Sequence, residues 1–135
     1  MVESFFANKA TPPAAALLGW QLVREDPEAG TIEIAFCPDE RMLNSAGTVQ
    51  GGFVAAMLDD TMGPALVSMS GGRVMPSSIN LTVSFLRPVK PGRVVGRGRV
   101  VKLGKAIAFL EAELFDDDGV LLARGTSSAV PIAIS

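Results

Sequence analysis

Residues 44–70 constrain this chain most, because they combine helical periodicity with apolar residues on nearly every side. At about 100° per residue, one apolar stripe gathers around Leu58, and the opposite side of the helix is apolar too. The stripe holds Val54, Leu58, Thr61, Met62, Ala65 and Met69, and the opposite side holds Phe53, Ala56, Gly63 and Val67. A helix that is apolar all round is a buried helix. We therefore expect a long central helix at about 49–70 that ends at Gly71-Gly72. Pro64 should remove one of its backbone hydrogen bonds.

Two adjacent carboxylates, Asp59 and Asp60, lie inside this apolar stretch. Asp59 is about 100° from Leu58, at the edge of the stripe, whereas Asp60 is about 200° away and points elsewhere. A buried carboxylate must be paired, hydrogen-bonded or functional. Asp59 is therefore the first candidate for chemistry, with an ion pair to an arginine across an interface as the alternative, and Asp60 is the weaker candidate.

The composition excludes several kinds of site. The chain has 135 residues and no histidine, which fits a single domain over 1–135 and rules out Ser-His-Asp triads, Cys-His pairs and the usual His-containing zinc sites. We expect neither a metal nor a cofactor. The single cysteine, Cys37, is interpreted as a small core hydrophobe in a reducing compartment.

Charge and hydropathy limit the partners and the compartment. The net charge of −2 gives no general attraction to nucleic acid. No run of about 18 apolar residues is present, and the N-terminal sequence does not fit a secretory signal. We expect a cytoplasmic protein that binds neither a membrane nor nucleic acid.

The remaining sequence is typical of strands joined by short turns. Alternation predicts a hairpin from strands at 20–24 and 31–37, and four further strands at 74–89, 92–103, 106–115 and 120–132. Single helical turns are expected at 4–9 and 14–18. The layout is α+β, with one antiparallel sheet packed on one long helix. Because such a sheet covers only one side of the helix, the other apolar side predicts a homo-oligomer.

Basic residues are distributed unevenly. Residues 61–110 contain no Asp or Glu but carry Arg73, Arg87, Lys90, Arg93, Arg97, Arg99, Lys102 and Lys105. One interpretation is that these side chains solvate the outer faces of strands. The other is a surface that holds a phosphorylated ligand.

Four motifs carry a family resemblance. They are Asn44-x-x-Gly47-x-Val49-Gln50-Gly51-Gly52, Met57-Leu58-Asp59, Ser84-Phe85-Leu86-Arg87-Pro88 and Leu122-Ala123-Arg124-Gly125-Thr126. Together, over roughly residues 15–132, they resemble the hotdog-fold acyl-CoA thioesterases, and more narrowly the 4-hydroxybenzoyl-CoA and phenylacetyl-CoA thioesterase branches. The resemblance implies an antiparallel sheet wrapped around one long central helix. It also implies a homodimer, often a homotetramer, with active sites at the dimer interface.

The resemblance also implies a role for each matching position. The backbone N–H of Gly51 polarises the thioester carbonyl, and Gln50 and Asn44 orient the substrate or a water. Asp59 is the general base or the nucleophile, two mechanisms that the sequence leaves open. Further residues expected at the substrate are Ser78, which positions the water, Ser77 one residue away, Gly52 beside the oxyanion site, and Arg87, Lys90, Arg93 and Lys105 for the CoA phosphates.

The expected function is hydrolysis of an acyl- or aryl-CoA thioester to the free acid and CoA. The family often has histidine where this chain has Gln50, and glutamine can donate a hydrogen bond but cannot carry a proton. This difference permits an alternative, a non-catalytic acyl-CoA-binding or regulatory hotdog protein, which the retention of Asp59 disfavours. A hotdog hydratase or dehydratase ranks last, because those enzymes use an Asp-His pair. The sequence leaves the acyl group open.

Overall fold

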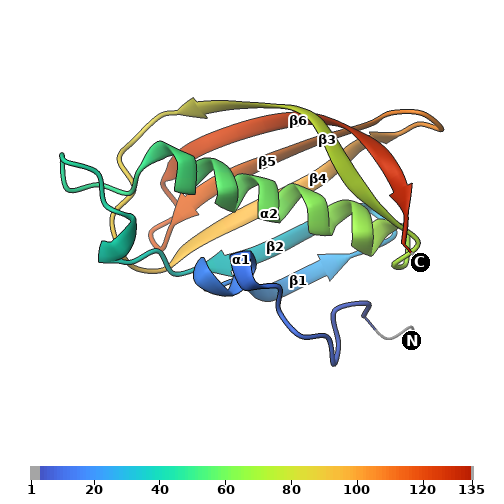
Figure 1. Ribbon diagram of the computed structural model, residues 1–135, viewed down its shortest axis with the longest axis horizontal. Helices are drawn as coiled ribbons and strands as arrows, with labels where there is room; N and C mark the ends of the chain where they lie inside the picture. Colours follow the sequence, from blue (N-terminus) through green and yellow to red (C-terminus); the bar gives the residue numbers. More distant parts are fainter. Residues whose placement is uncertain (1–3, 135) are drawn as a thin grey trace.

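Within residues 4–134, which the computed structural model describes, six strands form one antiparallel sheet that wraps around a long helix (Figure 1). The elements in chain order are α1 (Pro13–Leu17), β1 (Gln21–Asp26), β2 (Thr31–Phe36), the 3-10 turn η1 (Glu40–Met42), α2 (Gly51–Met69), β3 (Val74–Phe85), β4 (Val94–Leu103), β5 (Ala108–Asp116) and β6 (Leu121–Ala133). The predicted α+β layout of two strands, one long helix and four strands is confirmed. Residues 5–8 form hydrogen-bonded turns, where one helical turn was expected.

The strand order β1-β2-β4-β5-β6-β3 places β1 and β3 at the two edges of the sheet. The chain leaves β2, passes through α2 beneath the sheet and joins the opposite edge as β3, which pairs with β6 from Val74↔Ala133 to Phe85↔Ala123. Among the described residues, the other side of β3 has no neighbouring strand. It exposes Met75, Ile79 and Phe85 by 49%, 58% and 57%. An edge strand with exposed apolar side chains is a surface suited to pairing.

Close contact between α2 and β4 depends on two glycines. A Cβ at Gly96 would lie 2.2 Å from the Oγ1 atom of Thr61, and a Cβ at Gly98 would lie 2.8 Å from the Thr61 carbonyl oxygen. Thr61 is fully buried, and its hydroxyl donates to the Met57 carbonyl at 2.7 Å. The helix therefore rests on a strip of sheet that lacks side chains.

Pro64 lies inside α2, and the helix continues through it. Proline has no N–H, so the carbonyl of Asp60 loses its helical donor. The indole Nε1 of Trp20 takes that place and donates to this carbonyl at 3.0 Å. Pro64 thus creates an acceptor that ties the start of the β1–β2 hairpin to the middle of α2.

Two features of the burial differ from expectation. Cys37 is exposed, so its interpretation as a core residue is wrong. It follows Phe36, the last residue of β2, where the inward-facing register of that strand ends. The second side of α2 is only half-buried at Phe53, Ala56, Gly63 and Val67, and Asp59 is exposed. No helix among the described residues is long and apolar enough to cross a membrane.

The contact at Thr61 predicts a specific pattern of stability. Gly96→Ala should lower the free energy of unfolding by about 1–3 kcal/mol, because the new methyl group overlaps the Thr61 side chain. The cost should shrink when Gly96→Ala is made in a Thr61→Ala background. Gly98→Ala is the matched control, since its closest contact is the Thr61 backbone oxygen at 2.8 Å, which Thr61→Ala leaves in place. Urea unfolding of the three single and two double variants measures these differences, and equal costs of Gly96→Ala in both backgrounds would contradict the packing described.

Candidate active site

The two carboxylates of α2 lie on the wall of one cavity of about 540 Å³. The cavity lies between α2, the segment that precedes β1, and the start of β3. Its lining is mainly apolar and aromatic, and consists of Phe5, Phe6, Lys9, Ala10, Thr11, Pro12, Ala15, Trp20, Asp59, Asp60, Gly63, Pro64, Val67, Met75, Pro76, Ser78 and Ile134. Carboxylates in an apolar hollow are typical of acid–base sites.

Ser78 lines the same cavity and Ser77 does not. Successive side chains of a strand point to opposite faces of the sheet, so only one of the two hydroxyls can face α2. The structure therefore brings Ser78 to the cavity of Asp59, as the family resemblance implies, and directs Ser77 away from it.

Both carboxyl groups have raised pKa values. Burial raises the pKa of Asp60 to about 6, and the neighbouring charge of Asp59 adds to this shift. Partial burial also raises the pKa of Asp59, although its side chain reaches the exposed rim of the cavity. Among the described residues that line the cavity, Lys9 is the one basic residue. A carboxylate held in this way is a stronger base than one in water.

The sequence predicted that the side chains of Asp59 and Asp60 point to different surroundings, and the structure differs. Their difference of about 100° around the helix predicted that Asp60 points elsewhere. In the structure, the cavity extends across that angle, and both residues line it. The signal in the sequence was the pair Gly63 and Pro64, which lies one turn after Asp60 and leaves no long side chain to fill the space.

The start of α2 offers a second set of functional groups. The carbonyl of Gln50 accepts from the N–H groups of Phe53 and Val54, whereas those of Gly51 and Gly52 have no acceptor among residues 4–134. The side chain of Gln50 is exposed and caps nothing. The ring of Phe85 covers Gly51, where a Cβ would lie 3.2 Å from its Cζ atom. Free N–H groups at the positive end of a helix can bind a carbonyl oxygen that develops negative charge.

Asn44 organises the loop that leads to this helix start. Its Oδ1 atom accepts from the backbone N–H groups of Ala46 and Thr48 at 2.9 and 3.2 Å and from the Thr48 hydroxyl at 3.3 Å. The side-chain oxygen is thus engaged within the loop, and only the Nδ2 group is left to contact a substrate.

The two halves of the site lie far apart in one chain. Gly51 and Asp59 are separated by eight residues, or about 12 Å along the helix axis. A reacting carbonyl must lie within about 3 Å of its oxyanion donor and of the attacking group. The Gly51 amide and the Asp59 carboxylate of one chain therefore cannot act on the same carbonyl.

Three of the four predicted phosphate ligands gather in a second hollow, of about 620 Å³. Arg87, Lys90 and Arg93 line it together with the β5–β6 turn, and Lys105 lies elsewhere, between β4 and β5. Arg93 pairs with Asp117 at 2.9 Å, and Arg87 donates to the Leu121 carbonyl at 2.6 Å. Within residues 4–134, Lys90 makes no hydrogen bond or ion pair. The preceding carbonyl, that of Val89, accepts from Val49, which places Lys90 near the start of α2.

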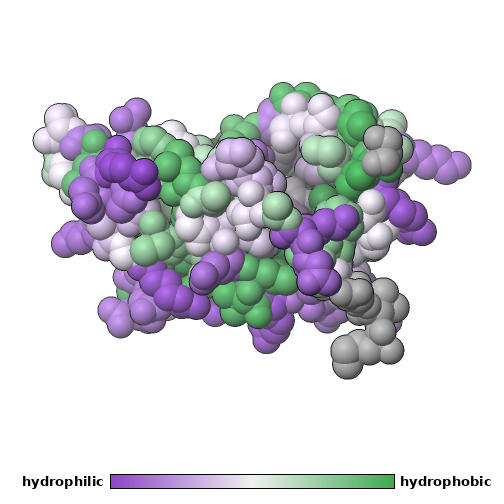
Figure 2. Space-filling model, turned by 60° about the horizontal axis from the view of Figure 1, so that its bottom comes forward, coloured by the Kyte–Doolittle hydropathy of each residue, from purple (hydrophilic) through white to green (hydrophobic). Residues whose placement is uncertain are grey.

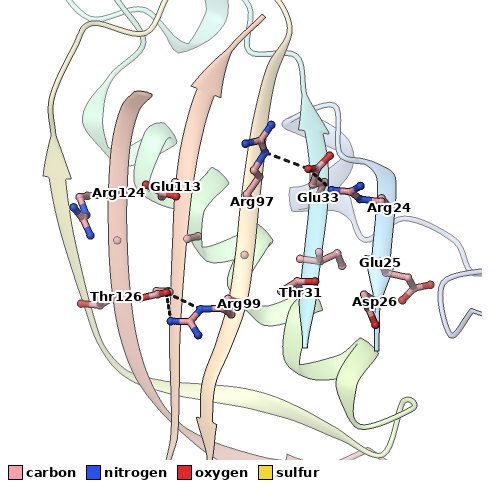
Figure 3. Close-up of a pocket in the computed structure, with 15 residues that line it drawn as sticks. Arg24, Glu25, Asp26, Thr31, Glu33, Arg97, Arg99, Glu113, Arg124 and Thr126 are labelled. Carbon is pink, nitrogen blue, oxygen red and sulfur yellow. Dashed lines mark hydrogen bonds and ion pairs between the residues drawn. The ribbon is translucent and has the colours of Figure 1, made fainter. Parts of the chain in front are cut away.

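Two other basic residues of the acid-free stretch 61–110, Arg97 and Arg99, lie on the outer face of the sheet (Figure 3). Arg97 pairs with Glu33 at 3.2 Å, and Arg99 pairs with Glu111 at 2.6 Å. These residues line a shallow hollow of about 410 Å³ that carries both signs of charge. On this face, Arg97 and Arg99 pair with acids of neighbouring strands, as the strand-face interpretation expects. Among the described residues, no group of three His, Cys, Asp or Glu side chains could hold a metal ion.

Comparisons with known proteins identify the family and the fold. The family model described as "Thioesterase superfamily" matches residues 46–123, more than half of the chain. Human acyl-coenzyme A thioesterase 13 is 30% identical over 89 residues, which span 64% of this chain and 63% of that protein. A crystal structure of a phenylacetic acid degradation-related protein from Ralstonia eutropha JMP134 matches with a TM-score of 0.86 and 33% identity over 92% of this chain and 93% of that one.

A further structure shows the fold alone. A Streptococcus mutans UA159 protein solved bound to acetyl CoA has a TM-score of 0.76 at 17% identity, over 84% of this chain and 89% of that one. Together with the Ralstonia structure, it confirms the hotdog fold expected from the sequence.

The raised pKa of Asp60 predicts how stability depends on pH. Between its ordinary value of 3.8 and about 6, the folded chain keeps a proton that the unfolded chain releases, so stability falls as the pH rises through this window. Asp60→Asn removes the penalty. Its melting temperature should exceed that of the wild type above pH 6 and match it below pH 4. Calorimetry across this range measures the difference. Asp59→Asn is the control with a smaller gain, and a gain for Asp60→Asn that grows as the pH falls would refute the assignment.

Proposed function

Because this chain belongs to the thioesterase superfamily, we propose that it hydrolyses acyl-CoA thioesters at a site formed by two copies of the chain. Membership makes the chain a thioester hydrolase. The proposal of a shared site rests on the distance between its functional groups within one chain. Asp59 and Ser78 share one cavity, whereas the N–H of Gly51, which has no acceptor among residues 4–134, lies about 12 Å back toward the start of the same helix. In the proposed site, the amide of one copy faces the carboxylate of the other.

Strand β3 supports this arrangement, because it carries a residue of each half. Ser78 lines the cavity of Asp59, and Phe85 covers Gly51. If two copies pair their free β3 edges antiparallel about an axis between Leu81 and Thr82, Ser78 of one copy lies opposite Phe85 of the other. The same pairing would satisfy the unpaired edge and cover the exposed apolar side chains of β3.

The chemistry follows from these positions. The Gly51 N–H of one copy holds the thioester carbonyl oxygen, and the Gln50 side chain beside it donates a further hydrogen bond. As general base, Asp59 of the other copy takes a proton from a water held by Ser78, the hydroxide attacks the carbonyl carbon, and the C–S bond breaks. The proton then goes to the CoA thiolate. As nucleophile, Asp59 would form a mixed anhydride that water cleaves, and both routes remain candidates.

The CoA part of the substrate is assigned by charge and by the relatives. Human acyl-coenzyme A thioesterase 13 is named for this substrate, and the Streptococcus mutans protein was solved with acetyl CoA. Lys90 has no ion-pair partner within residues 4–134 and lies near the helix start, with Arg87 and Arg93 in the same hollow. These three are proposed to meet the CoA phosphates. Lys105 lies outside that hollow and is the weakest of the four candidates.

Asp59 should carry the chemistry. Asp59→Asn keeps the size of the side chain but removes the base, so kcat should fall by about 10²- to 10⁴-fold. Asp60→Asn should change kcat by less than about tenfold. Release of free CoA from a panel of acyl-CoAs, read with a thiol reagent, measures both. A reversed order would make Asp60 the base, and a wild type that binds but never hydrolyses any acyl-CoA would favour the non-catalytic alternative.

Two inactive variants should restore each other if the site is shared. Gly51→Pro deletes the amide N–H at the first helical position, where proline is tolerated, and the extended backbone of Gln50 (φ −60°, ψ 142°) suits a residue before proline. Alone, it should lower kcat by about 10²- to 10³-fold. Refolded together in equal amounts, Gly51→Pro and Asp59→Asn should regain about a quarter of wild-type activity, because each mixed dimer has one intact site. Activity no higher than the average of the separate variants would place both groups in one chain.

A further inference from the structure

The cavity beside Asp59 is built largely by the segment that precedes the sheet. Residues 5–12, with Ala15 and Trp20, form one side of it, and α2 forms the other. The segment crosses the face of the molecule that carries α1 and β1, where hydrophobic patches lie among hydrophilic residues (Figures 1 and 2). It lies outside the family match at 46–123, so nothing in that match assigns it a role.

Three aromatic side chains of this segment form a row along α2. The ring centroids of Phe5 and Phe6 are 5.5 Å apart, and those of Phe6 and Trp20 are also 5.5 Å apart. Trp20 is fixed to the middle of α2 by its hydrogen bond to the Asp60 carbonyl. Phe5 and Phe6 pack edge to face at 85° and Phe6 and Trp20 are tilted by 55°, and these contacts with the Trp20 hydrogen bond make a fixed wall.

The other end of the row is fixed at the end of α2. Phe5 lies against Gly72, where a Cβ would come within 2.3 Å of the Phe5 Cδ2 atom. The N–H of Gly72 donates to the Val67 carbonyl, and Val67 and Ile134 line the cavity with Phe5. Only glycine at position 72 leaves room for this ring. Phe5 therefore lines the far end of the cavity, near Val67, which lies eight residues and about 12 Å along the helix from Asp59.

We propose that this cavity holds the acyl group of the substrate and that Phe5 sets its maximum length. This inference rests on the proposed function and adds the substrate class. Lined by aromatic, proline and aliphatic side chains and closed about two helix turns from Asp59, the cavity fits compact apolar acyl groups, either medium-length aliphatic chains or a single aromatic ring. Long aliphatic chains do not fit.

The test compares acyl-CoAs of increasing length. Acetyl-, hexanoyl-, decanoyl-, benzoyl- and hexadecanoyl-CoA are titrated calorimetrically into Asp59→Asn protein, which keeps the cavity and slows turnover. Affinity should rise from acetyl- to the medium-length and benzoyl thioesters and fall for hexadecanoyl-CoA. In an added Phe5→Ala background, hexadecanoyl-CoA should gain about tenfold in affinity relative to hexanoyl-CoA. An unchanged ratio overturns the inference.

Two neighbouring glycines supply a matched pair of variants that leave Phe5 in place. Gly71 and Gly72 both have positive φ, 65° and 82°, so alanine strains the backbone at either position. A Cβ at Gly71 meets nothing within 4 Å, whereas one at Gly72 collides with Phe5. Gly72→Ala should therefore shift the length preference as Phe5→Ala does, and Gly71→Ala should not. Equal behaviour of the two glycine variants contradicts the role of Phe5.

The proposed function is judged by a separate measurement. Hydrolysis by the wild type decides whether the chain is an acyl-CoA thioesterase, and the binding series decides where the acyl group lies. A length limit that Phe5→Ala removes supports the cavity assignment even in a protein without turnover. Conversely, hydrolysis with the same length profile in all variants sustains the function and refutes the assignment.

Discussion

The structure depends on one constraint, which is that α2 is apolar on nearly every side and must be covered all round. The sheet covers the side that carries Leu58 and Met62, where Gly96 and Gly98 let the helix approach the strands. A second side is covered by the segment that contains Phe5, Phe6 and Trp20. The cover over that side is incomplete, and the space that remains is the cavity of Asp59 and Asp60. The site is therefore a gap in the packing around a helix whose sheet-facing side is fully buried.

This origin explains the electrostatics of the site. Carboxylates on an exposed helix would be solvated and would have ordinary pKa values. Here, the same residues that cover α2 exclude water from Asp60, and Asp59 adds a like charge next to it. Pro64 contributes indirectly, because the carbonyl that it frees fixes Trp20 and so holds the aromatic wall in place. The local sequence thus shapes the two carboxylates and their surroundings together.

The sequence predicted the helices and strands well, but it predicted poorly which side chains are buried and which charges are paired. The long helix, the strands and the α+β layout follow from periodicities that do not depend on tertiary contacts. Burial does depend on them, which is why Cys37 was misplaced: one residue beyond Phe36, its strand stops facing the core. Likewise, the acid-free stretch 61–110 is acid-free only along the chain, since antiparallel pairing places Glu33 beside Arg97 and Glu111 beside Arg99.

Tertiary structure also decides which of the predicted site residues lie close together. Asp59 and Ser78, 19 positions apart, meet because β3 returns beside the helix that it follows, and this connection is a consequence of the fold. Gly51 and Gln50 start the same helix yet lie too far from Asp59 to share a substrate with it. Sequence spacing alone cannot distinguish residues that meet from residues that complement each other across a symmetry axis. The rise of 1.5 Å per helical residue does distinguish them, and it makes a second copy of the chain a chemical requirement for the proposed hydrolysis as well as a means of covering β3.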